Sequence, residues 1–212
     1  VASENGERTV QFMGTMNNGT VDVTGLTRSA GVSHEGFNLI GNPYPSALDL
    51  GSAIDHPGIT LNNIDSTIWF RSGGNFITYN WASGTSQSSG DSIVPPMQGF
   101  WVRVSADATS GSLQFTNAAR KHENINTFYK KSRTAEEDIF RMTASNKELS
   151  DEAVIGFYRQ ARDRMDPYDS EKRFSDMIEY PQLYTLIDTT AFAINGFNPL
   201  ENETLEVPLG FK

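Results

Sequence analysis

Residues 36–50, GFNLIGNPYPSALDL, are the most informative stretch of the sequence, because they join a short apolar strand to a turn that contains two prolines. Each proline fixes its own φ at about −65° and pushes the residue before it out of the α region. Asn42 and Tyr44 are therefore expected to be extended, and the chain is stiff over the four residues 42–45. We therefore expect this corner to have a structural role rather than a chemical one.

Outward from this corner, period-2 strand patterns separated by glycine and asparagine turns dominate the first part of the chain. Residues 66–81 predict a hairpin whose two-residue turn is Gly73-Gly74. This register places Ile68, Phe70, Ile77, Tyr79 and Trp81 on a core face with Ser66. The opposite face carries Thr67, Trp69, Arg71, Phe76 and Thr78, and it either packs under a second sheet or meets a ligand.

Residues 93–105 stiffen at Pro95-Pro96 and then alternate as a strand. Phe100, Val102 and Val104 are expected to point to one side, and Trp101 and Arg103 to the other.

Charged residues become denser after residue 120, which marks the best internal boundary. We expect a first β-sandwich unit over residues 1–120, a connector over 121–137 and a second β unit over 138–212. In the second unit, hairpins are expected from residues 138–158 and from 182–195, followed by a strand over residues 204–211 that should either lie at an edge or end at Pro208. A short helix is expected over residues 169–178, capped by Asp169. The predicted class is all-β, with one or two β-sandwich (jelly-roll-like) units and this single helix.

Composition excludes several functions. The chain has 212 residues, no cysteine and a formal net charge of −9. The absence of cysteine excludes thiol catalysis, disulfides and cysteine-ligated zinc. The negative charge disfavours nucleic acid and anionic membranes as partners, and no apolar run is long enough for membrane insertion.

The ordered set GFNLIGNPYPSALDL, IWFRSGGNFITYNW, SIVPPMQGFWVRV and the charged tail through VPLGF resembles a β-rich region of large secreted Bacteroidetes proteins. In those proteins the region lies near the C-terminus, before the sorting domain read by the type IX secretion system. The resemblance covers about Val10 to Phe211, and it implies an adhesin-like module at the cell surface or in the medium, with no catalytic residue to transfer. The sequence carries neither that sorting domain nor a signal peptide, so we expect an excised or processed piece of a longer protein.

The sequence also contains two candidate ligand sites. Asp163, Asp166 and Asp169 recur at every third residue and supply the oxygen ligands that calcium prefers, although a turn that leads to a capped helix, with solvated ion pairs, is the favoured interpretation. The aromatic residues Trp69, Phe76 and Trp101, flanked by Arg71 and Arg103, have the flat faces that suit sugar rings, although core packing is the alternative.

Catalytic patterns are weak. His34, His56 and His122 are scattered without metal-ligand spacing, and the chain has no Gly-x-Ser-x-Gly motif. We therefore expect no enzyme, and no cofactor unless calcium is bound. The leading hypothesis is a non-catalytic module of a secreted or cell-surface protein, which serves adhesion, spacing or presentation of the neighbouring domains that are its expected partners. A carbohydrate-binding module for surface polysaccharide is the alternative, and a secreted hydrolase fragment is the third.

Overall fold

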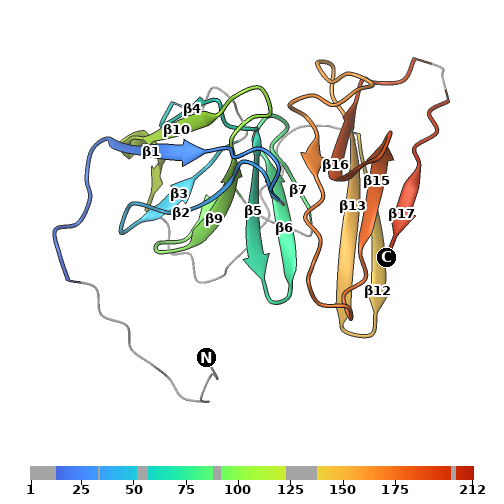
Figure 1. The fold of residues 1–212 in the computed structure, drawn as a ribbon, viewed down its shortest axis with the longest axis horizontal. Helices are drawn as coiled ribbons and strands as arrows, with labels where there is room; N and C mark the ends of the chain where they lie inside the picture. Colours follow the sequence, from blue (N-terminus) through green and yellow to red (C-terminus); the bar gives the residue numbers. More distant parts are fainter. Residues whose placement is uncertain (1–12, 33, 52–56, 88–91, 123–137, 202–203) are drawn as a thin grey trace.

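The protein is described from a computed structural model, which covers residues 13–32, 34–51, 57–87, 92–122, 138–201 and 204–212. Its described residues are almost entirely β-strand and connecting turn, with one 3₁₀ turn at Asn117–Ala119. The all-β class predicted from the sequence is therefore confirmed. Figure 1 shows three layers, with β1, β4 and β10 on one side, β5 and β6 in the middle, and β13, β15 and β16 on the other side.

The first layer consists of two small three-stranded sheets. One has the order β1-β10-β4 and the other the order β11-β3-β8. Their strands are β1 Val21–Thr27, β3 Ala47–Asp49, β4 Ile59–Asn62, β8 Ile93–Val94, β10 Ser110–Phe115 and β11 Arg120–Lys121.

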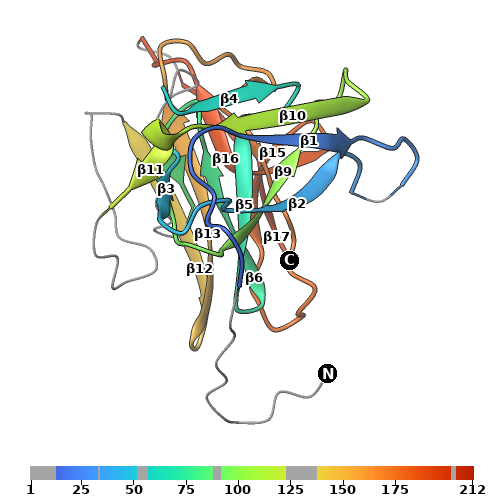
Figure 2. The same ribbon diagram turned by 90° about the vertical axis from the view of Figure 1, so that its left-hand side faces the viewer.

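The middle layer is a five-stranded sheet with the order β2-β9-β5-β6-β7. Its strands are β2 Phe37–Gly41, β5 Thr67–Ser72, β6 Asn75–Asn80, β7 Thr85–Ser86 and β9 Gly99–Arg103. Figure 2 shows β1 and β10 running across the direction of β5 and β6. The first two layers therefore form a sandwich whose strands cross steeply.

The third layer is a six-stranded sheet with the order β12-β13-β16-β15-β17, in which β14 also pairs with β16. Its strands are β12 Ile139–Asn146, β13 Leu149–Phe157, β14 Ser170–Glu171, β15 Leu183–Ile187, β16 Thr190–Phe197 and β17 Leu209–Phe211. The two predicted hairpins are confirmed as β12–β13 and β15–β16. The last strand lies at the edge of the sheet, as the sequence predicts, but it begins directly after Pro208 instead of at residue 204.

The double-proline corner carries the chain from the middle layer into the first. It follows β2 and precedes β3, and Asn42 is buried within it. The Asn42 Nδ2 group donates to the carbonyls of Ser46, Val94 and Pro95, so it also holds the second proline corner in place. The Tyr44 hydroxyl donates to the carbonyls of Gly19 and Phe115 across the sandwich.

The hydrophobic core lies between the first and middle layers. The β5–β6 register pairs Ile68 with Tyr79 and Phe70 with Ile77, which confirms the predicted two-glycine hairpin. Ile68, Phe70, Tyr79 and Trp81 of the predicted core face are buried, and Ser66 and Ile77 are partly buried. Phe100, Val102 and Val104 of the strand after Pro95-Pro96 are also buried. Alternation therefore identified the inward-facing residues of both segments correctly.

One predicted element is wrong. Residues 169–178 do not form a helix, because Ser170 and Glu171 pair with β16 and the following residues form turns. Ser170 and Lys172 are both buried, with period-2 rather than helical spacing. Pairing with a neighbouring strand satisfies the backbone here and outweighs a weak local helix preference.

The expected domain boundary falls mostly on residues 123–137, which lie outside the described part of the chain. Before these residues, β11 pairs with β3 in the first layer. After them, β12 is the first strand of the third layer. The second unit consists of one six-stranded sheet, and β14 and β16 of this sheet contact β6 of the first unit.

Candidate functional site

The outer face of the β5–β6 hairpin is covered by the second unit. We call residues 167–180, which cross this face, the bridging segment. Thr67, Trp69, Phe76 and Thr78 of the hairpin are each at most 5% exposed. Of the two alternatives for this face, packing under a second sheet is therefore the one that the structure shows.

Polar contacts bind the bridging segment to the hairpin along its length. Asn80 Nδ2 donates to the carbonyls of Pro167 and Asp169 at 3.0 and 3.2 Å. The Thr67 and Ser170 hydroxyls lie 2.9 Å apart, and Trp69 Nε1 donates to the Glu171 carbonyl at 3.1 Å. These contacts satisfy buried polar groups on both sides, so the joint is specific rather than only hydrophobic.

Arg173 of the bridging segment occupies the aromatic cluster that the sequence singled out. Its guanidinium lies 4.8 Å from the ring centre of Phe76, 5.4 Å from that of Trp101 and 4.4 Å from that of Phe37. Burial lowers the pKa of Arg173, while the charge of Asp176 acts in the opposite direction. A cation over aromatic faces is stabilising when it is partly desolvated.

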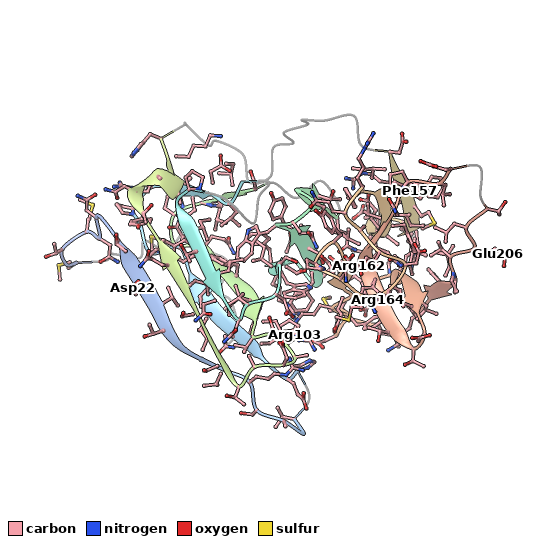
Figure 3. The ribbon with its side chains drawn as sticks, turned by 90° about the horizontal axis from the view of Figure 1, so that it is seen from above. Asp22, Arg103, Phe157, Arg162, Arg164 and Glu206 are labelled. Carbon is pink, nitrogen blue, oxygen red and sulfur yellow. The ribbon has the colours of Figure 1, made fainter. Side chains whose placement is uncertain are left out.

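The two flanking arginines also make contacts within the protein. Arg103 pairs with Glu171 at 2.6 Å, and Arg71 pairs with Asp176 at 3.4 Å while lying over the Phe76 ring. In Figure 3 Arg103 lies close to the second unit, whereas Asp22 and Glu206 lie at opposite ends of the molecule. The structure thus brings the predicted carbohydrate-binding residues together, and their contacts are with the bridging segment.

Trp69 and Phe76 are buried in this structure, so neither ring has a face accessible to a sugar. Trp101 is partly buried, and the Arg173 guanidinium lies over its ring. The prediction of a carbohydrate surface at these residues is therefore not supported by their positions. The physical reason is that the faces are used to pack one unit against the other.

The three aspartates proposed for calcium form a turn. Asp166 Oδ1 and Oδ2 accept from the backbone N–H groups of Tyr168 and Arg162, and Asp169 Oδ2 accepts from the Asp166 N–H. Asp163 lines a surface depression together with Arg159 and Glu201. Among the residues that the structure describes, no group of three or more metal-ligating side chains is found.

Asp169 is the most perturbed of these carboxyls. Burial raises its pKa from 3.8 to about 7, and the Asp166 charge adds to the shift, although N–H donors from Gly196 and Asp166 oppose it. Its Oδ1 accepts from Gly196 N at 2.8 Å, which ties the turn to β16. Asp169 thus acts as a buried structural acceptor.

A buried ion pair that the sequence analysis missed lies beside this joint. Lys172 Nζ lies 2.5 Å from Asp151 Oδ2, and the two side chains are 1% and 0% exposed. Asn75 and Gln87 of the first unit donate to Asp151 Oδ1. Ser170 and Lys172 are buried at alternate positions, which is the only local sign that Lys172 points into the protein. Its partner Asp151 is distant in the sequence, so no short pattern links the two residues.

His34 lies beside Phe37 and Arg173, His122 is exposed, and His56 lies outside the described residues. Within the described part of the chain, no helix is long and apolar enough to cross a membrane.

Comparison with protein families identifies one match. Residues 70–212 match the family described as Domain of unknown function (DUF8693). The chain belongs to this family. The match begins within β5 and continues through the second unit to the C-terminal residue, so it includes the bridging segment and most of its contacts. Searches of curated proteins and of solved structures give no match.

Proposed function

We propose that this DUF8693 chain is a non-catalytic, rigid module of a secreted or cell-surface bacterial protein, which spaces or presents neighbouring domains. The observation that carries the proposal is the bridging segment. It buries Trp69 and Phe76 and places charged, hydroxyl and amide groups of both units in direct contact. A joint of this kind resists hinge motion, because opening it would expose apolar surface and leave polar groups unpaired.

The use of charged groups also favours a structural role. Asp151, Lys172, Asp166 and Asp169 all bind groups within the protein. Support for location and for adhesion comes from the resemblance to secreted Bacteroidetes proteins. Both can be checked by fractionating cells that produce the parent protein and locating it by antibody.

Rigidity can be tested by the distance between the two units. Since the chain has no cysteine, Asp107→Cys in the first unit and Glu148→Cys in the β12–β13 turn would accept a donor and an acceptor dye. We expect one narrow distance distribution that is insensitive to salt. The pair Asp22→Cys and Asp107→Cys, both within the first unit, sets the width expected for a rigid body. A distribution much broader than this control, or one with two populations, would overturn the proposal.

A further inference from the structure

Lys172 and Asp151 face each other in a setting that is unusual for an ordinary ion pair. The Lys172 ammonium follows β14 and the Asp151 carboxylate belongs to β13, with Nζ and Oδ2 2.5 Å apart and both side chains almost completely buried. Removing two such charges from water carries a large desolvation penalty. An amine and a carboxyl group held in contact and shielded from solvent are also the two reactants of amide formation.

The protonation states suit such a reaction. Burial lowers the pKa of Lys172, and the negative charges of Asp151 and Glu152 oppose that shift. Moving one proton along the Nζ–Oδ2 hydrogen bond converts the ion pair into a neutral amine and a neutral carboxylic acid. Burial penalises the charged ammonium form of Lys172 relative to water. A desolvated lysine in its neutral form is a competent nucleophile.

The other oxygen of Asp151 lies in a preformed donor site. Asp151 Oδ1 accepts from Asn75 Nδ2 at 3.1 Å and from Gln87 Nε2 at 2.9 Å. The amide oxygens of Asn75 and Gln87 are buried and have no hydrogen-bond partner among the described residues, whereas both NH₂ groups donate to Asp151. Two donors at these distances stabilise the negative oxygen that develops when a carboxyl carbon is attacked.

We infer that Lys172 and Asp151 form an intramolecular isopeptide bond. Lys172 Nζ attacks Asp151 Cγ, and the negative charge develops on Oδ1 beside Asn75 and Gln87. The Cγ–Oδ2 bond then breaks, and Oδ2 leaves as water with the proton received from Lys172 and a second proton lost from Nζ. The products are an amide and one water molecule, so no oxidant, cofactor or other reactant is required.

The bond would join β13 to the bridging segment, at the point where the first unit supplies two hydrogen-bond donors. It goes beyond the proposed spacer role, which needs only the non-covalent contacts. Because the dye distances report the joint and a mass measurement reports the bond, failure of one proposal is distinguishable from failure of the other.

The decisive experiment is the intact mass of the purified full chain under denaturing conditions, followed by a tryptic peptide map. We expect the mass to be lower than the sequence mass by one water molecule. The map should contain a branched peptide that joins Asp151 to Lys172, with no cleavage after Lys172. The full sequence mass would overturn the inference, as would a water loss that maps to other residues.

Variants sharpen this test. Lys172→Arg should keep its full sequence mass, whereas the matched control Lys147→Arg, in the exposed β12–β13 turn, should lose water as the unmodified chain does. Asp151→Asn should expel ammonia instead of water, so its final mass should equal that of the unmodified chain after reaction. A chain kept in denaturant from synthesis should carry the full mass and lose water only after refolding. Water loss in the chain that was never folded would contradict a reaction that depends on the fold.

Discussion

At the scale of single residues, aromatic side chains on similar strands differ greatly in how far they are buried. Trp69 is 1% exposed and donates to the Glu171 carbonyl, whereas Phe140 on the edge strand β12 is 58% exposed. Both residues lie on strands with alternating patterns, so the pattern alone does not separate them. The difference comes from what covers each strand.

Trp69→Ala should lower the free energy of unfolding by about 3 to 5 kcal/mol, because it removes a large buried side chain and leaves a cavity. Trp101→Ala should cost less, since Trp101 is only partly buried. Urea unfolding followed by circular dichroism measures both. Phe140→Ala is the control and should change the free energy of unfolding by no more than about 0.5 kcal/mol. Near-native stability of Trp69→Ala would contradict the packed position.

Asp169 should make stability depend on pH. Its pKa is 3.8 when unperturbed and about 7 in the folded protein, so the folded state holds this proton more tightly than the unfolded state. The resulting stabilisation is fully present below about pH 4 and is lost as pH rises to about 7, with a magnitude on the order of a few kcal/mol.

The test compares thermal unfolding at several pH values between 4 and 8, values chosen to span the shift from about 4 to about 7. Asp169→Asn should flatten this part of the profile, whereas Asp163→Asn should keep the slope. An unchanged slope in Asp169→Asn would show that other groups cause it.

At the scale of elements, close approach of chain segments restricts particular glycines. A Cβ added at Gly196 of β16 would lie 2.6 Å from Tyr168 Cβ and 3.1 Å from the Tyr168 carbonyl oxygen. A Cβ at Gly41 of β2 would meet no atom within 4 Å. The two positions therefore form a matched pair of strand glycines with opposite surroundings.

Gly196→Ala should destabilise the protein by about 1 to 3 kcal/mol, because the turn before β14 must move away from β16. Gly41→Ala should be close to neutral. Thermal or urea unfolding of the two variants checks this, and equal stabilities would contradict the close packing of Tyr168 on β16.

The failure of the helix prediction also belongs to this scale. Residues 169–178 have apolar residues at helical spacing, yet Ser170 and Glu171 pair with β16 and Lys172 N donates to the Ala191 carbonyl. Helix propensity differences are a few tenths of a kcal/mol per residue, so they yield to pairing and burial of this kind. No local sequence pattern predicts pairing with a strand that follows later in the chain.

At the scale of the whole molecule, the two units should unfold together. Asn80 contacts Pro167, Asp169 and Ser170, and Asn75 and Gln87 contact Asp151, so loss of one unit removes buried partners from the other. We expect a single calorimetric transition whose calorimetric and van't Hoff enthalpies agree. Asn80→Leu should lower the temperature of that single transition. Two separate transitions would show that the units are independent.

The sequence by itself determined the all-β class, the Gly73-Gly74 hairpin with its core face, the strand after Pro95-Pro96 and the edge position of the last strand. These features depend on alternation, on glycine and on proline, which act over a few neighbouring residues. Tertiary structure alone decided that Trp69 and Phe76 are covered, that Arg173 lies among the aromatic rings, and that Lys172 meets Asp151 beside Asn75 and Gln87. Some of these contacts join residues more than a hundred positions apart, and their energies depend on burial, which no short stretch of sequence specifies.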